Sequence, residues 1–246
     1  MLFSILAGGD IRTIIISILL TIPVVLISLS VHESAHGYIA MKLGDPTAYN
    51  IGRVTINPLK HLDPLGSLCM LAFGYGWAKP VPINARNFKN PKVGMALTAI
   101  AGPVSNILLG IMGALVFAIT DITSGIAIGY ITGAGAVFPS IGFTVLYTFL
   151  QFCELFSMMN FMLAAFNLIP VPPFDGSRFV FLFLPTKIYF AIMKYEKFVM
   201  IGVLVGFIVL SRVFNFSPFF WIAQKAFFAV LDPIYQLFLL ILNFVV

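Results

Sequence analysis

Two histidines and a glutamate form the pattern H-E-x-x-H at His32, Glu33 and His36. In an α-helix this spacing places the two imidazole rings about one turn apart on one face, so both rings can reach a single metal ion. The glutamate is not needed as a ligand. It can instead take a proton from a water molecule that a zinc ion has made more acidic. The pattern therefore predicts two zinc ligands, His32 and His36, with Glu33 as general base.

A catalytic zinc ion usually has a third protein ligand and one open position, and Asp175 is the candidate for that ligand. It follows Pro170, Pro172 and Pro173 at the end of a long apolar stretch. These prolines force the backbone out of a helix, which at membrane depth is tolerated only where protein or a wet cavity satisfies the backbone. The alternative is that Asp175 begins an Asp-Gly turn and caps the following helix.

The composition explains why a metal site of this kind would lie inside a membrane. Of the 246 residues, 60% are hydrophobic and only 9% are charged, and the mean hydropathy is +1.04. This balance is unlike that of a soluble domain and predicts a polytopic membrane protein. Two cysteines are too few to suggest a disulfide framework.

We expect an all-α membrane protein with about five transmembrane helices, between four and six, in a single membrane-embedded domain over residues 1–246. A hydrocarbon core of about 30 Å requires roughly 20 apolar residues per helix. The last predicted segment is either a fifth span or a helix along the membrane surface. The predicted segments are 11–43, 93–120, 141–169, 198–210 and 219–246.

The stretch between the first two spans, at about 45–92, is rich in proline and glycine and predicts a non-helical insert. Residues alternate between apolar and polar along 49–56, which together with 81–84 predicts a small β-rich region within this insert.

Lysine and arginine residues gather in two loops, between the first and second spans and between the third and fourth. The loop between the second and third spans has none. The positive-inside rule then predicts a multi-pass protein of the cell membrane with its N-terminus outside and both basic loops in the cytosol. The prolines before Asp175 would lie near the cytosolic face, so the active site is expected toward that side.

These residues resemble the site-2 protease family of intramembrane zinc metalloproteases. The resemblance rests on H-E-x-x-H in an early helix and on an N-x-x-P segment leading to Asp-Gly, formed here by Asn167, Pro170, Asp175 and Gly176. Phe174 stands where the family usually has leucine, a conservative departure. Further segments look like the compact bacterial and archaeal branch without PDZ or CBS domains: 57–64, 76–84 and 101–106.

The resemblance implies one catalytic zinc ion on His32, His36 and Asp175, with Glu33 as general base. It also implies that Asn106 and Asn167 face the active site and bind substrate backbone or a developing oxyanion. An asparagine in a membrane helix equally often bonds to a neighbouring helix.

The implied reaction is hydrolysis of a peptide bond in or near a transmembrane segment of a membrane-anchored protein or peptide, near the cytosolic face. The implied partners are that substrate and the lipid bilayer, with no nucleic acid. Such a reaction would serve regulated intramembrane proteolysis or the clearance of signal-peptide remnants.

Two other classes fit part of the sequence: a membrane metal-ion transporter, and a catalytically silent adaptor of the same fold. Glu33 argues against both, because a transporter does not need it and a silent member would be expected to have lost one of the four groups. His61 either bonds locally or acts at the metal. Glu154 either gates water, pairs with a cation such as Arg178, or bonds across helices.

Overall fold

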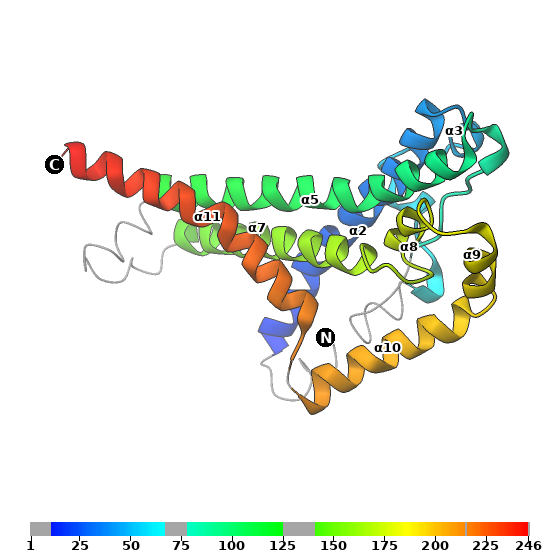
Figure 1. Cartoon of the computed structure of the whole chain (residues 1–246). Helices are drawn as coiled ribbons and strands as arrows, with labels where there is room; N and C mark the ends of the chain where they lie inside the picture. Colours follow the sequence, from blue (N-terminus) through cyan, green and yellow to red (C-terminus); the bar gives the residue numbers. More distant parts are fainter. Residues whose placement is uncertain (1–10, 67–77, 125–140, 215, 246) are drawn as a thin grey trace.

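Four long helices dominate the computed structural model, which describes residues 11–66, 78–124, 141–214 and 216–245. They are α2 (Ile11–Lys42), α5 (Pro91–Ser124), α7 (Ile141–Asn167) and α11 (Pro218–Val245). Helix α7 packs against the other three, and α5 also packs against α2 and α11 (Figure 1). The shorter helices are α3 (Thr47–Asn50), η1 (Pro58–Lys60), η2 (Ala85–Asn87), α8 (Asp175–Val180), α9 (Thr186–Met193) and α10 (Glu196–Val213).

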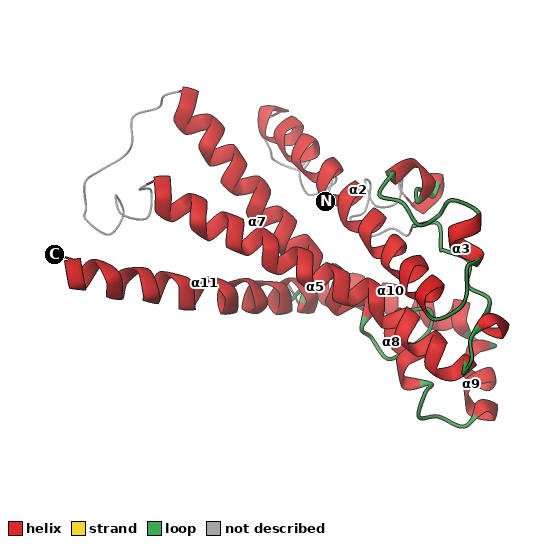
Figure 2. Cartoon of the chain, turned by 90° about the horizontal axis from the view of Figure 1, so that it is seen from above, coloured by secondary structure: helices red, strands yellow, loops and turns green. Residues whose placement is uncertain are grey.

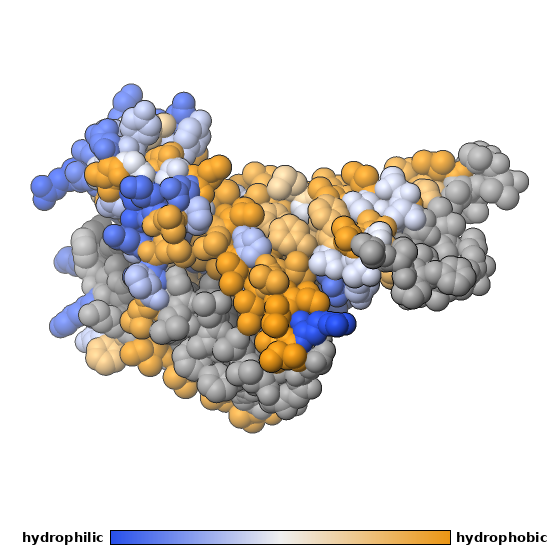
Figure 3. Space-filling model, turned by 180° about the vertical axis from the view of Figure 1, so that it is seen from behind, coloured by the Kyte–Doolittle hydropathy of each residue, from blue (hydrophilic) through white to orange (hydrophobic). Residues whose placement is uncertain are grey.

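The four long helices are also long and apolar enough to cross a membrane, over Ile14–Lys42, Pro91–Ser124, Gly142–Asn167 and Pro218–Ile241. The prediction of an all-helical, polytopic membrane protein is thereby confirmed. The predicted span at 198–210 coincides with α10, whose apolar part is shorter than a full crossing. Hydrophilic residues gather around α3 at one end of the molecule, and apolar residues cover the sides of the long helices (Figure 3).

The β-rich part of the predicted insert is not supported. Within the described parts of residues 45–92, the chain forms α3, two 3-10 turns, helical residues at 64–66, the start of α5 and one isolated bridge, between Leu62 and Ala78 (Figure 2). The physical reason lies partly in Pro80 and Pro82, which have no N–H to donate to a ladder of strands. The insert is therefore irregular with short helical turns rather than a small sheet.

Helices α5 and α7 approach closely through small residues. A Cβ added to Gly110 would lie 2.8 Å from the ring of Phe161, so a larger residue there would force this ring to move. The Ser157 hydroxyl of α7 donates to the Gly110 carbonyl at 2.6 Å. Close packing through small residues with interhelical hydrogen bonds is typical of membrane helices. This contact fixes α7 against α5, and α5 in turn faces the histidines of α2.

Candidate metal centre

Helix α2 presents His32 and His36 on the face that packs against α5. The Nδ1–H of His32 donates to Oδ1 of Asn106 at 2.7 Å, and the Nδ1–H of His36 donates to the Thr98 carbonyl at 2.7 Å. Both histidines are buried, with 5% and 6% of their surface exposed. Since each Nδ1 carries the proton, each Nε2 keeps its lone pair for a metal ion.

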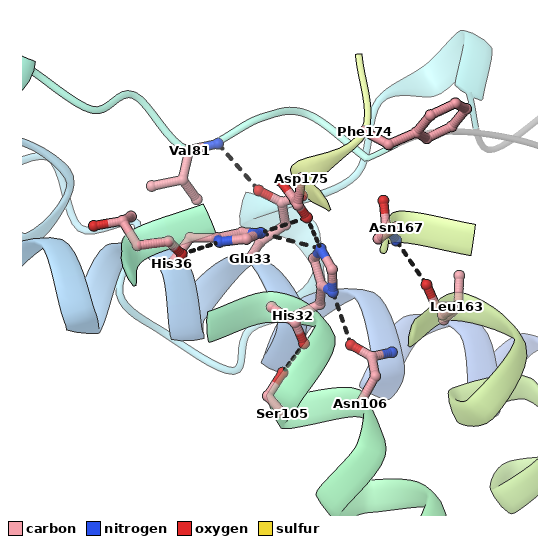
Figure 4. Close-up of polar contacts among 12 residues, drawn as sticks. His32, Glu33, His36, Val81, Ser105, Asn106, Leu163, Asn167, Phe174 and Asp175 are labelled. Carbon is pink, nitrogen blue, oxygen red and sulfur yellow. Dashed lines mark hydrogen bonds and ion pairs between the residues drawn. The ribbon is translucent and has the colours of Figure 1, made fainter. Parts of the chain in front are cut away.

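Asp175 is brought to these two nitrogens by the prolines that end α7 and by α8, which begins at Asp175 itself. Its Oδ2 lies 3.1 Å from Nε2 of His32 and 3.2 Å from Nε2 of His36, and the two Nε2 atoms lie 3.1 Å apart (Figure 4). The carboxylate points to the histidines rather than to the backbone at the start of α8. The cap position there belongs to Phe174, which makes no side-chain cap bond.

The three atoms fit a zinc ion. Ligands about 2.0–2.1 Å from zinc at tetrahedral corners are about 3.4 Å apart, close to the separations seen here. Two imidazoles and a carboxylate form a common catalytic donor set for zinc, and they leave a position open. Within the described ranges they also form the one group of three such side chains close enough to share an ion.

Gly102 of α5 leaves the space that an ion at this place would need. A Cβ built on Gly102 would lie 2.4 Å from Nε2 of His36 and 2.6 Å from Nε2 of His32. Any side chain at this position would thus press against both ligand nitrogens. The cradle formed by Gly102, the two histidines and Asp175 therefore has room for a small ion and none for a methyl group.

The electrostatics of the cradle keep Asp175 in the form that binds metal. Burial by itself raises the pKa of this carboxyl, but attraction to His36 and hydrogen bonds from the Nε2 atoms of His32 and His36, when these rings are protonated, outweigh it. The pKa of Asp175 is therefore held below its ordinary value. An ionised carboxylate is what a zinc ligand requires.

Glu33 lies beside this cradle and outside the set of three. It is half-buried, and its Oε2 accepts a hydrogen bond from the Val81 N–H at 3.1 Å. Helical geometry points Glu33 away from the line joining His32 and His36 but keeps it next to them. The carboxylate is thereby available to exchange protons near the cradle without serving as a ligand.

Asn106 is fully buried, and both ends of its amide are engaged. Besides the bond to His32, its Nδ2 donates to Oδ1 of Asn160 at 3.2 Å, and Asn160 donates to the Phe156 carbonyl at 2.8 Å. This arrangement favours a role in orienting His32 over direct contact with substrate. Asn167 is half-buried and donates to the Leu163 carbonyl of its own helix at 3.0 Å, so its part in substrate binding stays a prediction.

His61 is placed away from the metal cradle. Its ring Nε2 donates to the Thr55 carbonyl at 2.7 Å and lies 3.4 Å from the Ser34 hydroxyl, which also bonds to Thr55. It thus fastens the insert to α2 and does not join the group that could hold an ion. Local bonding, one of the two roles expected for it, agrees with this placement.

Glu154 lies at the middle of α7 and lines a pocket of about 510 Å³ between α2, α7 and α11, together with Gln151 and Gln224. Among the residues that the structure describes, no ion pair joins it to Arg178. Pairing with Arg178, one of the alternatives for Glu154, is therefore not seen in the described part of the chain.

Three contributors to the site were not predicted as functional: Gly102, the Thr98 carbonyl and the Val81 amide. The motif at 101–106 contains Gly102 and Asn106 four residues apart, and Thr98 lies a further four residues earlier. This i, i+4, i+8 spacing places Thr98, Gly102 and Asn106 on one face of α5. The spacing indicates that these residues face the histidines only when α5 is known to pack against α2.

The chain combines long apolar helices with a buried cradle of two histidines and one carboxylate, and a glutamate adjoins this cradle. These features define the class of membrane metallohydrolases. The family can be stated directly, because the model of Peptidase family M50 matches residues 20–211. The chain belongs to this family of site-2 proteases, and it is a zinc metalloprotease of the membrane.

Two relatives are similar to this chain over much of its length. The putative zinc metalloprotease YwhC of Bacillus subtilis (strain 168) is 36% identical over 187 residues, which cover 74% of this chain and 77% of the relative. The zinc metalloprotease MJ0392 of Methanocaldococcus jannaschii is 29% identical over 152 residues, which cover 62% of this chain and 30% of that protein. No solved structure matches the chain.

Proposed function

We propose that this chain is an intramembrane zinc endopeptidase in which His32, His36 and Asp175 hold the ion and Glu33 is the general base. The observation that carries the proposal is the convergence of the three ligand atoms within 3.2 Å of one another, with the Glu33 carboxylate beside them. A transporter would have no use for this adjoining carboxylate. We further propose that the catalytic unit is a single membrane-embedded domain over residues 1–246.

The chemistry would follow from the roles of these groups. Zinc, when bound, supplies the Lewis acidity that makes a water molecule acidic near neutral pH. Glu33 takes a proton from that water molecule while the water oxygen bonds to the scissile carbonyl carbon. Glu33 then delivers the proton to the amide nitrogen as the C–N bond breaks, so the products are a carboxylic acid and an amine. Asn106 keeps the His32 ring oriented, and Asn167 is a candidate contact for the substrate backbone.

The place of the site in the membrane supports cleavage near the cytosolic face. His36 lies six residues before Lys42 at the end of α2, which puts it about 9 Å inside that helix end. The basic residues of the insert follow at the same end, and the positive-inside rule assigns this end to the cytosol of a cell-membrane protein. The N-terminus would then lie outside.

The substrates we propose are membrane-anchored proteins or peptides cut in or near a transmembrane segment. The site lies among spanning helices, so it is reached by chains that are themselves held in the bilayer. Such cleavage would serve regulated intramembrane proteolysis or the removal of signal-peptide remnants.

The test compares purified wild-type protein with Glu33→Gln and His36→Ala on a membrane-helix substrate. Glu33→Gln should keep one zinc ion per chain and lose at least about 100-fold in cleavage rate, whereas His36→Ala should lose the ion as well. Mass spectrometry of the products would show whether the cut is internal, as required of an endopeptidase. Full cleavage by Glu33→Gln would contradict the assigned mechanism.

A further inference from the structure

One backbone N–H of the insert is directed at the proposed general base. Val81 donates to Oε2 of Glu33 at 3.1 Å (Figure 4). Its neighbours on both sides, Pro80 and Pro82, have no N–H. The segment 80–82 therefore has a single backbone N–H, that of Val81, and this N–H donates to Glu33.

The Val81 side chain is seated on the same face of α2 as Glu33. It is buried, with 7% exposed. A Cβ added to Gly37, one turn after Glu33, would lie 3.4 Å from Cγ1 of Val81 and 2.9 Å from Cγ2 of Val54. The absence of a side chain at Gly37 thus lets the insert approach α2 closely enough for the backbone bond to form.

Arg53 holds the residues directly before Val81. Its guanidinium Nη2 donates to the Lys79 carbonyl at 2.5 Å and to the Pro80 carbonyl at 3.2 Å. Lys79 is also fixed through its N–H, which donates to the His61 carbonyl at 2.8 Å. The backbone that carries the Val81 N–H is consequently tied down at three points.

The environment of Arg53 is unusual for a charged side chain. It is 7% exposed, no ion pair joins it to a carboxylate within the described ranges, and its Nε has no acceptor there. A buried charge without a counter-charge is costly. The bonds that Arg53 does make go to the two carbonyls that precede Val81, which points to support of this backbone as its role.

We propose that Arg53 and Val81 are positioning residues for Glu33. Arg53 fixes the backbone at Lys79 and Pro80, and this directs the Val81 N–H to one oxygen of the Glu33 carboxylate. That bond restricts rotation of the carboxylate and leaves its second oxygen to receive the proton from water. The inference rests on the proposed function for its catalytic meaning and on the contacts above for its geometry.

The decisive experiment replaces the Val81 N–H by an ester oxygen. The α-hydroxy analogue of valine, introduced at position 81 of the full chain by nonsense suppression, keeps the side chain and removes the donor. It also makes the Pro80 carbonyl, which accepts from Arg53, an ester carbonyl and thus a weaker acceptor. We expect kcat to fall about 10-fold or more, with KM and zinc content unchanged. The same replacement at Ile83, whose N–H makes no bond within the described part of the chain, is the matched control and should leave kcat unchanged. A kcat within about twofold of wild type for the position-81 ester would overturn the proposal.

A second readout does not depend on proteolysis. In zinc-free protein, the ester at position 81 should lower the melting temperature by about 4 °C when Glu33 is present and by clearly less in a Glu33→Ala background. Equal losses in both backgrounds would overturn the proposal. If wild-type protein cuts no substrate, the proposed function fails, while this coupling between Val81 and Glu33 is still measured.

Substitutions of Arg53 test whether its guanidinium fixes the backbone at Lys79 and Pro80 for the bond to Glu33. Arg53→Gln should lower kcat about 10-fold without loss of zinc, and Arg53→Lys, which keeps the charge and a donor, should recover part of it. The exposed Arg86 is the control, since Arg86→Gln removes an arginine of the same insert without touching Lys79 or Pro80. Loss of kcat to the same extent in Arg86→Gln would contradict a specific role for Arg53.

Discussion

Gly102 of α5 faces His36 of α2 so closely that a Cβ on the glycine would lie 2.4 Å from the ring Nε2. This is far inside van der Waals contact. The glycine is thus required by what lies opposite rather than by its own backbone conformation, which is helical. The ligand nitrogens converge on the space that it leaves.

Gly102→Ala should therefore remove zinc from the protein. The added methyl group would press on both histidine nitrogens, and we expect the zinc content to fall from about one ion per chain to below about 0.1, with loss of activity. Metal analysis of purified protein checks this, and a melting curve establishes that the variant is folded. Gly206→Ala is the matched control, because no described residue lies within 4 Å of a Cβ built there. Normal zinc content in Gly102→Ala would contradict the proposal that zinc binds in this cradle.

Asn106→Leu should weaken zinc binding while the fold persists. The substitution leaves the Nδ1–H of His32 without its acceptor, and loss of such an outer partner typically costs about 10–100-fold in metal affinity. Competition with a chromogenic chelator measures the change. Asn167→Leu is the comparison, since among the described residues its amide bonds within its own helix, and its zinc affinity should stay near wild type. Similar losses in both variants would mean that Asn106 has no special link to His32.

The pH dependence of stability should show the contribution of Asp45, which is buried just after α2. Burial raises the pKa of this carboxyl, but hydrogen bonds from Thr47, Asn84 and Asn87 outweigh it and lower the pKa below its ordinary value. Because the folded-state pKa is lowered, the stabilisation is complete above the unfolded pKa of about 4 and is lost as pH falls through the folded pKa.

Asp45→Asn should accordingly melt at a lower temperature than wild type near pH 7, by an amount equivalent to about 2 kcal/mol. The difference should shrink as pH falls below about 4. Thermal unfolding in detergent at several pH values measures it. The exposed Asp232 is the control, and Asp232→Asn should melt close to wild type near pH 7. A constant difference at all pH values would mean that the charge of Asp45 is not what stabilises the insert.

The long helices and the candidate metal ligands could be predicted from the sequence because their signals are local. Apolar length alone marks α2, α5, α7 and α11, and the spacing of His32 and His36 follows from the helical repeat. Asp175 was found through the prolines that precede it. These signals depend on neighbours in sequence, so one chain is enough to read them.

The remaining parts of the site depend on contacts between distant segments. A glycine such as Gly102 gives no sign of what lies opposite its missing side chain, and the Val81 amide is a donor common to nearly every residue. The role of Arg53 appears only when its partners are known to be carbonyls of the same insert. The predicted β-rich region failed for a related reason, since alternating residues suggested strands but Pro80 and Pro82 removed the donors that a ladder needs.

The order of the ligands along the chain has a consequence for biosynthesis. His32 and His36 lie in the first described span, whereas Asp175 comes after the third. A ribosome must therefore complete three spans and the turn beyond them before the set of donors exists. A partly synthesised chain thus lacks the full set of candidate donors and cannot yet form the metal centre.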